Sequence, residues 1–123
     1  PMIYVRPKPK DHGKGRQIEG RFSENDKIVL IDDLITTGGS VLNAVKATEK
    51  DGGHVAGVSS IFTYYLPDAK ENFKKANVKY APLLSYPELL KKENESGHIT
   101  SEQYDILKTW HEDPWAWGKK FNN

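Results

Sequence analysis

The sequence has no cysteine, no strong net charge and no long hydrophobic segment, and each absence excludes a class of protein. Without cysteine there are no disulfides and no thiolate-bound metal. The 18 Lys and Arg residues nearly balance the 17 Asp and Glu residues, so no bulk charge predicts binding to nucleic acid. We find no membrane-spanning run, signal-peptide pattern or internal repeat. We therefore expect a single cytoplasmic domain over residues 1–123, with no membrane partner.

A stretch from Lys27 to Ser40 joins a short apolar run to a polar, glycine-rich loop. Residues 28–31 are Ile-Val-Leu-Ile, and such an unbroken run is typical of a strand buried on both faces in the middle of a parallel sheet. A helical pattern follows over residues 41–48 and is closed by Gly52-Gly53. Strand, loop and helix in this order make half of a β-α-β unit, whose loop lies where open α/β sheets bind ligands.

The loop of this stretch has the chemistry of a sugar-phosphate site. Its hydroxyls and glycines precede a helix start, where unpaired N–H groups and the positive end of the helix dipole favour an anion. Asp32 and Asp33 would repel that phosphate and suit sugar hydroxyls or a magnesium ion instead. An ordinary strand end and loop are the alternative, but the combination favours a ligand site. No Walker or dinucleotide-binding glycine pattern is present. The expected phosphate-binding residues are Thr36, Thr37, Gly38, Gly39 and Ser40.

Residues 6–20 form a second distinctive segment, which is polar and rich in proline and glycine. Only Ile18 in it is apolar, so we expect an exposed loop without regular structure, of the kind that often serves as a functional lid. Such a lid would close over a polyanion and offset the charge of a departing pyrophosphate. A solvated basic loop, or one that touches nucleic acid, is the alternative. The clustered basic residues are Arg6, Lys8, Lys10, His12, Lys14 and Arg16.

Two motifs in these segments resemble a known family. Ile28–Ser40 resembles the phosphoribosyl pyrophosphate (PRPP) motif of the type I phosphoribosyltransferases. Arg6-x-x-x-Lys10-Asp11-His12-Gly13, followed by Ile18-Glu19-Gly20, resembles the catalytic loop of the orotate phosphoribosyltransferases. The resemblance covers nearly the whole chain. It implies an α/β fold with a parallel sheet flanked by helices, and transfer of a phosphoribosyl group from PRPP to orotate, giving orotidine 5′-phosphate and pyrophosphate in pyrimidine biosynthesis.

The resemblance also implies roles for individual residues. Asp32 and Asp33 hold the ribose hydroxyls, the following loop holds the 5′-phosphate, and Thr36 also touches orotate. Mg²⁺ arrives with the oxygens of PRPP, without a direct protein ligand. The family's loop closes over the active site of the neighbouring subunit, which implies a homodimer. The catalytic residues are Arg6, Lys10 and His12, and the PRPP-binding set adds Asp32, Asp33, Leu34, Ile35, Thr36, Thr37, Gly38, Gly39 and Ser40.

Three features depart from the family pattern. The chain opens abruptly on an apparent buried strand, and the family's substrate hood and pyrophosphate-binding loop are missing. We therefore expect a truncated, C-terminal part of such an enzyme, with exposed apolar strand surface. Pro7 stands where many members have lysine, which leaves the role of Lys8 open. Some members have an orotate-binding arginine near Tyr64; this sequence has none, and we expect Tyr64 to pack at the domain edge.

These departures keep other functions open. A non-catalytic PRPP-binding regulator and an inactive fragment are the alternatives to an active transferase. A purine-specific phosphoribosyltransferase is disfavoured by the Lys-Asp-His-Gly sequence of the loop.

The remaining pattern predicts further strands and helices. We expect strands over 54–62 and 78–84, and a helix over 69–77 that is capped by Asp68. Capping boxes over 85–88 and 100–103 predict two more helices, and Asp113-Pro114 predicts a last turn. Three αβ repeats of this kind are typical of a parallel sheet covered by helices. We expect the C-terminal aromatic residues to serve as core or interface anchors.

Overall fold

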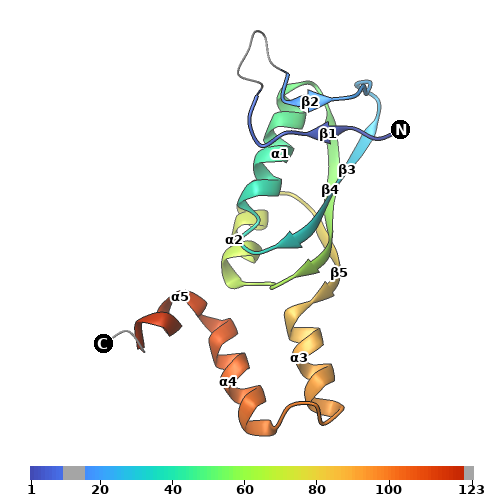
Figure 1. The fold of residues 1–123 in the computed structure, drawn as a ribbon. Helices are drawn as coiled ribbons and strands as arrows, with labels where there is room; N and C mark the ends of the chain where they lie inside the picture. Colours follow the sequence, from blue (N-terminus) through green and yellow to red (C-terminus); the bar gives the residue numbers. More distant parts are fainter. Residues whose placement is uncertain (10–15, 121–123) are drawn as a thin grey trace.

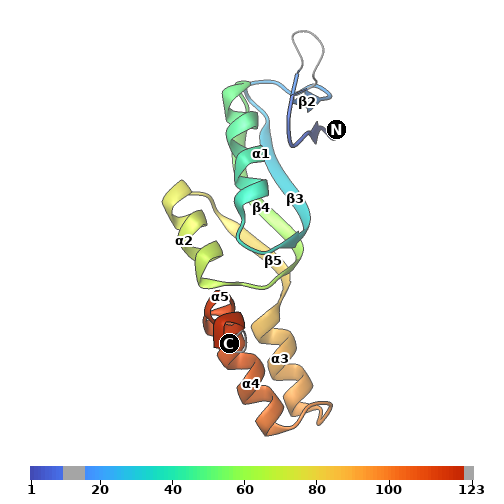
Figure 2. The ribbon, with the colours of Figure 1, turned by 60° about the vertical axis from the view of Figure 1, so that its left-hand side comes forward.

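The computed structural model describes residues 1–9 and 16–120, which are centred on a three-stranded parallel sheet. The strands β3 (Lys27–Ile35), β4 (His54–Thr63) and β5 (Tyr80–Ser85) lie side by side in sequence order. They are connected by α1 (Gly39–Lys50) and α2 (Pro67–Ala76), which lie on the same side of the sheet (Figure 1, Figure 2). The expected parallel sheet flanked by helices is confirmed.

The core lies between the sheet and these two helices. Its buried side chains come from alternate positions of the strands and from the apolar stripes of α1 and α2. Hydrophobic burial of this single layer is the main force that holds the helices to the sheet. The core residues are Leu30, Ile35, Val41, Leu42, Val45, Val58 and Phe73.

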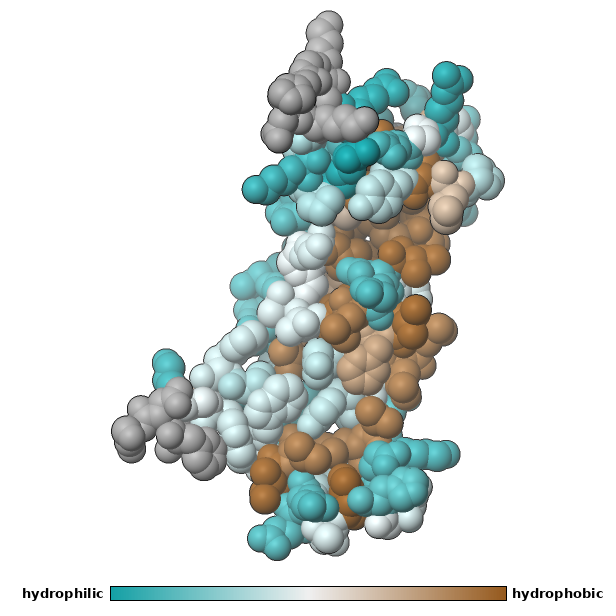
Figure 3. Space-filling model, viewed as in Figure 1, coloured by the Kyte–Doolittle hydropathy of each residue, from teal (hydrophilic) through white to brown (hydrophobic). Residues whose placement is uncertain are grey.

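The opposite face of the sheet is bare in the described residues. Val29 and Ile31 of β3 are 56% and 77% exposed, and Leu83 of β5 is 77% exposed. Figure 3 shows the hydrophobic surface along this side of the molecule. The expected exposure of apolar strand surface is confirmed, whereas the expectation that β3 is buried on both faces in mid-sheet is wrong. β3 is an edge strand here, and α1 and α2 cover only one of its two apolar faces.

Because only one face of the sheet is covered, substitution by threonine should reduce the free energy of unfolding much more on the covered face than on the bare face. We expect Ile31→Thr to alter the free energy of unfolding by less than about 0.5 kcal/mol, because the side chain already faces water. Val58→Thr, at a side chain that is 3% exposed, should cost about 1–3 kcal/mol, because it buries a hydroxyl without a designed partner. Urea denaturation of both variants measures the difference. An equally large cost at Ile31 would mean that this face is covered in solution.

The amino-terminal region forms a small ribbon apart from the main sheet. β1 (Tyr4–Val5) pairs antiparallel with β2 (Ile18–Glu19), and the side chain of Ile18 in β2 is buried. Two sequence expectations are wrong here. Tyr4 is 59% exposed, so the opening strand is not a buried one. Residues 18–19 form a strand where no regular structure was expected, because their backbone pairs with the opening residues.

The remaining helices start and end at the residues that local chemistry favours. α2 begins at Pro67 with Leu66 as its N-cap, so the expectation of an Asp68 cap is wrong; the fixed φ of proline suits the first helical position. Thr100 forms the expected capping box with Gln103, and Ser85 accepts a hydrogen bond from the Glu88 amide. The helices are α3 (Tyr86–Glu95), α4 (Ser101–Glu112) and α5 (Pro114–Trp117), followed by the 3-10 turn η1 (Gly118–Lys120).

Candidate functional site

A small hollow lies where β3 ends and α1 begins. Its volume is about 140 Å³, and it opens to solvent at the carboxyl edge of the sheet. The structure thus brings one of the two predicted carboxylates together with the whole predicted phosphate loop. The lining residues are Asp32, Leu34, Ile35, Thr36, Thr37, Gly38, Gly39, Ser40 and Val41.

The backbone at this hollow is suited to an anion. The first i→i−4 hydrogen bond of α1 runs from the Leu42 amide to the Gly38 carbonyl oxygen, at 3.0 Å. The amides of Gly39, Ser40 and Val41 therefore precede the helical ladder, and only Gly39 has a long contact, 3.4 Å, to the Thr37 hydroxyl. The first turn of α1 contains no acidic residue. Unpaired amides and the positive dipole end together favour a phosphate.

The neighbouring strand β4 fixes the start of the loop. The carbonyl oxygen of Ile35 accepts hydrogen bonds from the Tyr64 amide at 3.1 Å and from the Thr63 hydroxyl at 3.3 Å. Thr63 is fully buried and Ile35 is 2% exposed, so water does not compete for these bonds. The loop therefore leaves the sheet from a rigid position.

The two carboxylates are neighbours near the end of β3, and their side chains interact with each other. The Asp32 carboxylate accepts the Asp33 amide and the Asp33 carboxylate accepts the Leu34 amide, each at 2.8 Å. Of the pair, only Asp32 lines the hollow. Both nevertheless lie at the edge where the loop begins, within reach of an extended ligand.

The surroundings of Asp32 and Asp33 shift their pKa values in opposite directions. Partial burial, together with a side-chain hydrogen bond to Asp33, raises the pKa of Asp32. The same side-chain interaction, together with the hydrogen bond from the Leu34 amide, lowers the pKa of Asp33. As pH falls, Asp32 therefore takes up its proton first and donates it toward the carboxylate of Asp33.

We expect Asp33→Asn to lower the pKa of Asp32. The substitution removes the charge and the carboxylate acceptor beside Asp32, but the burial that contributes most to the upward shift remains. The reciprocal variant, Asp32→Asn, should raise the pKa of Asp33. Carboxyl ¹³C chemical shifts followed against pH measure both. Unchanged pKa values in the two variants would contradict this interaction between the side chains.

The predicted catalytic residues are not at this hollow. The Nε atom of Arg6 donates to a carboxylate oxygen of Glu19 at 2.9 Å, within the β1–β2 ribbon. Figure 1 shows this ribbon at the amino edge of the sheet, at the far end of α1 from the phosphate loop. Lys10 and His12, the other predicted catalytic residues, lie outside the described residues, as does Lys14.

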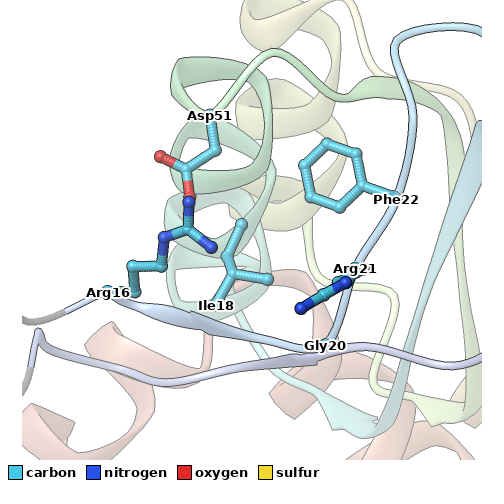
Figure 4. Close-up of a pocket in the computed structure, with 6 residues that line it drawn as sticks. All are labelled: Arg16, Ile18, Gly20, Arg21, Phe22 and Asp51. Carbon is cyan, nitrogen blue, oxygen red and sulfur yellow. The ribbon is translucent and has the colours of Figure 1, made fainter.

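A second, larger hollow marks where the ribbon meets the body of the molecule. It has a volume of about 530 Å³ and lies between the ribbon and Asp51, the C-cap residue of α1 (Figure 4). Arg16 extends toward Asp51 in this view, and Ile18 forms part of the apolar floor. The base of the predicted lid therefore rests at the end of α1 that faces away from the phosphate loop. The hollow is lined by Arg16, Ile18, Gly20, Arg21, Phe22 and Asp51.

An aromatic cluster joins the C-terminal helices to the segment that follows β4. The Nε2 atom of His111 lies 2.6 Å from the Tyr64 carbonyl oxygen, and the ring of His111 stacks on Tyr86. Tyr64 also contacts Trp110, so the expectation that Tyr64 packs at the domain edge agrees with its surroundings. Trp115 is 57% exposed and donates to Asp68 on α2. The hydrogen bonds of His111 and Trp115 each join residues 47 positions apart, and local patterns carry no signal for them.

Residues 1–9 and 16–120 contain neither a clustered set of metal ligands nor a helix suited to a membrane. No three His, Cys, Asp or Glu side chains there gather in an arrangement suited to a metal ion. In the same part of the chain, no helix combines the length and the apolar character needed to cross a membrane.

Comparison with known proteins gives strong sequence and structural matches, although no protein-family model matches the chain. Orotate phosphoribosyltransferase of Lactobacillus johnsonii is 94% identical over all 123 residues. UMP synthase of Leishmania donovani superimposes on 92% of this chain with a TM-score of 0.67 and 25% identity, over 24% of its own length. Orotate phosphoribosyltransferase of Mycobacterium tuberculosis in complex with PRPP superimposes on 62% of this chain with a TM-score of 0.52 and 29% identity, over 45% of its own length.

The coverage of these relatives is partial. The chain spans 58% of the length of the L. johnsonii protein. A second relative, from Levilactobacillus brevis, is 52% identical and is covered over 56% of its length. The parallel sheet with flanking helices is similar to part of these solved structures and of a phosphoribosyltransferase from Corynebacterium diphtheriae, which superimposes on 71% of this chain with a TM-score of 0.60 and 30% identity, over 50% of its own length.

Proposed function

Because the chain is closely similar over its whole length to part of the orotate phosphoribosyltransferases, we propose that it is the PRPP-binding part of such an enzyme. The reaction transfers a phosphoribosyl group from PRPP to orotate and yields orotidine 5′-phosphate and pyrophosphate. The observation that carries the proposal is the hollow at the carboxyl edge, where Asp32 and the loop from Thr36 to Ser40 meet at the start of α1. We propose residues 1–123 as one phosphoribosyltransferase-like unit, in which 28–40 bind PRPP and 6–20 form the catalytic loop.

In this proposal the loop and the carboxylates bind different parts of PRPP. The 5′-phosphate binds the amides of Gly39 and Ser40 and the hydroxyls of the loop, at the positive end of the α1 dipole. Asp32 and Asp33 accept hydrogen bonds from the ribose hydroxyls, and Leu34 and Ile35 contribute backbone groups only. Thr36, at the rim of the hollow, is the proposed contact to orotate. Ionised acceptors make such hydrogen bonds stronger than neutral ones.

The chemistry needs charge compensation at two places. Cleavage at the anomeric carbon develops positive charge on the ribose while negative charge leaves on pyrophosphate. Asp32 and Asp33 anchor the sugar beside the cationic centre, and Arg6, Lys10 and His12 offset the departing charge. His12 is also the candidate proton donor to the leaving group. Mg²⁺ would be held by the oxygens of PRPP, without a direct protein ligand, and would neutralise part of the pyrophosphate charge.

The position of Arg6 favours catalysis between two subunits. The nine residues of β3 span about 26 Å, and the ribbon that carries Arg6 lies at the opposite end of that strand from the phosphate loop. Closing the loop onto its own site would require it to cross most of the sheet. We therefore propose a homodimer in which residues 6–20 of each chain reach the hollow of the other. Charged, phosphorylated substrates of this kind fit a cytoplasmic location.

The same geometry supports a second candidate function for the 123-residue chain. The described residues bring the PRPP-binding elements together but leave Arg6 in an ion pair with Glu19, remote from the hollow. A chain that binds PRPP without turning it over is therefore the alternative. It would act as a non-catalytic PRPP-binding module or as an inactive fragment.

Two measurements on the 123-residue chain test these functions. Titration calorimetry with PRPP and Mg²⁺ measures binding, and release of pyrophosphate on addition of orotate measures transfer. Adenine and hypoxanthine serve as control bases, and the full-length L. johnsonii relative as the positive control. Binding with orotate-dependent release supports the transferase, whereas binding alone supports the non-catalytic module. A folded chain that binds no PRPP contradicts a functional site in this chain by itself.

A further inference from the structure

Helix α2 donates a side-chain hydrogen bond to the phosphate loop from behind. The Nδ2 atom of Asn72 donates a hydrogen bond to the Thr37 carbonyl oxygen at 3.0 Å, and the side chain is half-buried. Asn72 does not line the hollow at the carboxyl edge, and neither does its neighbour Phe73. The contact therefore lies behind the loop rather than in the site.

This hydrogen bond fixes the direction of a whole peptide group. In a trans peptide the C=O and the following N–H point in opposite directions. Since the Thr37 carbonyl is turned toward α2, the Gly38 amide is turned away from α2, toward the hollow that Gly38 lines. Within the described residues this amide donates to no protein oxygen, which leaves it available to a ligand.

The backbone at Gly38 permits the opposite arrangement as well. Its φ of 83° and ψ of 0° are those of the third residue of a type II turn. Rotation of the preceding peptide would convert such a turn into a type I turn, in which φ at this residue is negative. Glycine adopts both signs of φ at little cost, so the loop sequence alone does not choose between them. A contact from outside the loop therefore determines which of the two turn types forms at Gly38.

We propose that Asn72 is a positioning residue that locks the Thr37–Gly38 peptide with its N–H group facing the substrate phosphate. The proposal rests on the proposed PRPP site and explains how one amide of that site is oriented before the ligand arrives. Reversal of the peptide would place the Thr37 carbonyl oxygen against the phosphate and replace an attraction with a repulsion. Preorganised donors of this kind avoid the cost of reorienting during binding.

Amide NMR with ribose 5-phosphate as the probe tests this directly. In the wild-type chain we expect the amide signals of Gly38, Gly39 and Ser40 to shift on titration. In Asn72→Ala the Gly38 response should fall by half or more while Gly39 still responds, and the affinity should weaken about threefold to tenfold, as for loss of one hydrogen bond. Lys74→Ala, on an exposed position of the same helix, is the matched control and should behave as wild type.

A second variant replaces the hydrogen-bond donor of Asn72 with an acceptor and keeps the size of the side chain. Asn72→Asp replaces the donor with a carboxylate, which repels the Thr37 carbonyl and attracts the Gly38 amide. We expect the affinity to fall further than in Asn72→Ala, with the Gly38 signal displaced even without ligand. Repeating the titration of all three proteins at high salt separates this reversal from simple repulsion between the new carboxylate and the phosphate, because screening of that repulsion would shrink the difference between Asn72→Asp and Asn72→Ala.

The possible outcomes separate failure of the proposed phosphate site from failure of the proposed role of Asn72. If no loop amide responds in the wild-type chain, the proposed phosphate site fails, and the role of Asn72 fails with it. If Gly39 and Ser40 respond but Gly38 does not, the site stands and the role of Asn72 is overturned, even if no variant folds. An unchanged Gly38 response in a folded Asn72→Ala variant also overturns it alone.

Discussion

Replacing Asp32 and Asp33 together with asparagine should reduce PRPP binding by at least about 100-fold, whether or not the chain turns the substrate over. Each carboxylate accepts hydrogen bonds from ribose hydroxyls, and a hydrogen bond to a charged group contributes about 1.5–3 kcal/mol. Asparagine keeps the size of the side chain but offers one neutral acceptor in place of an ionised pair. Both carboxylates already accept an adjacent backbone amide, so the substitution acts on acceptor strength rather than on the strand. Calorimetric titration with Mg²⁺-PRPP measures the loss.

A charge-matched control separates contact from bulk electrostatics. Asp51→Asn combined with Asp105→Asn removes the same two negative charges at exposed positions on other elements. This control should bind PRPP as the wild-type chain does. In the Asp32/Asp33 variant, ribose 5-phosphate should still shift the Gly39 and Ser40 amides, because the loop remains intact. Tight PRPP binding by the Asp32/Asp33 variant would contradict the assignment of the ribose hydroxyls to this pair.

The parts of the fold that local chemistry encodes were predictable from the sequence. The apolar run over 28–31, the glycines after α1 and the capping box at Thr100 each leave a pattern within a few residues, and each element is present in the structure. Proline at position 67 was the competing local signal that displaced the expected start of α2 from Asp68. The phosphate loop was recognisable for the same reason, since its carboxylates, hydroxyls and glycines are contiguous.

The parts that depend on distant partners were not predictable. The unbroken apolar run of β3 correctly indicates two apolar faces, but it does not say what covers each one, and here Ile31 remains exposed. The contact from Asn72 to Thr37 joins residues 35 positions apart, and that from His111 to Tyr64 joins residues 47 apart. Neither side chain lies in a motif. Such contacts arise when α2 packs beside α1 and α4 reaches the segment after β4, which is a property of the tertiary structure.

Gly38→Ala should be the most damaging single change in the phosphate loop. An L-residue at φ of 83° costs about 1–2 kcal/mol, and the added methyl would lie 2.7 Å from Cε2 of Phe73. That ring is 4% exposed and stacks on Tyr80 at 4.4 Å, so it has little room to move. Overpacking of this kind adds about 1–3 kcal/mol. We expect a total loss of about 2–5 kcal/mol in the free energy of unfolding, measured by urea denaturation, together with loss of ribose 5-phosphate binding.

Two further substitutions separate the backbone cost from the steric one. Gly52 and Gly97 also have positive φ, 87° and 76°, but a methyl group at either would meet no atom within 4 Å. Alanine at these positions should therefore cost only the backbone share, about 1–2 kcal/mol. Phe73→Leu in the Gly38→Ala background should recover the steric share, and the double-mutant cycle gives the coupling between the two sites. Equal costs at Gly38 and Gly52, with no coupling to Phe73, would contradict a close approach between α2 and the loop. A positive coupling would show that α2 shapes the phosphate loop by packing at Phe73, next to the hydrogen bond from Asn72.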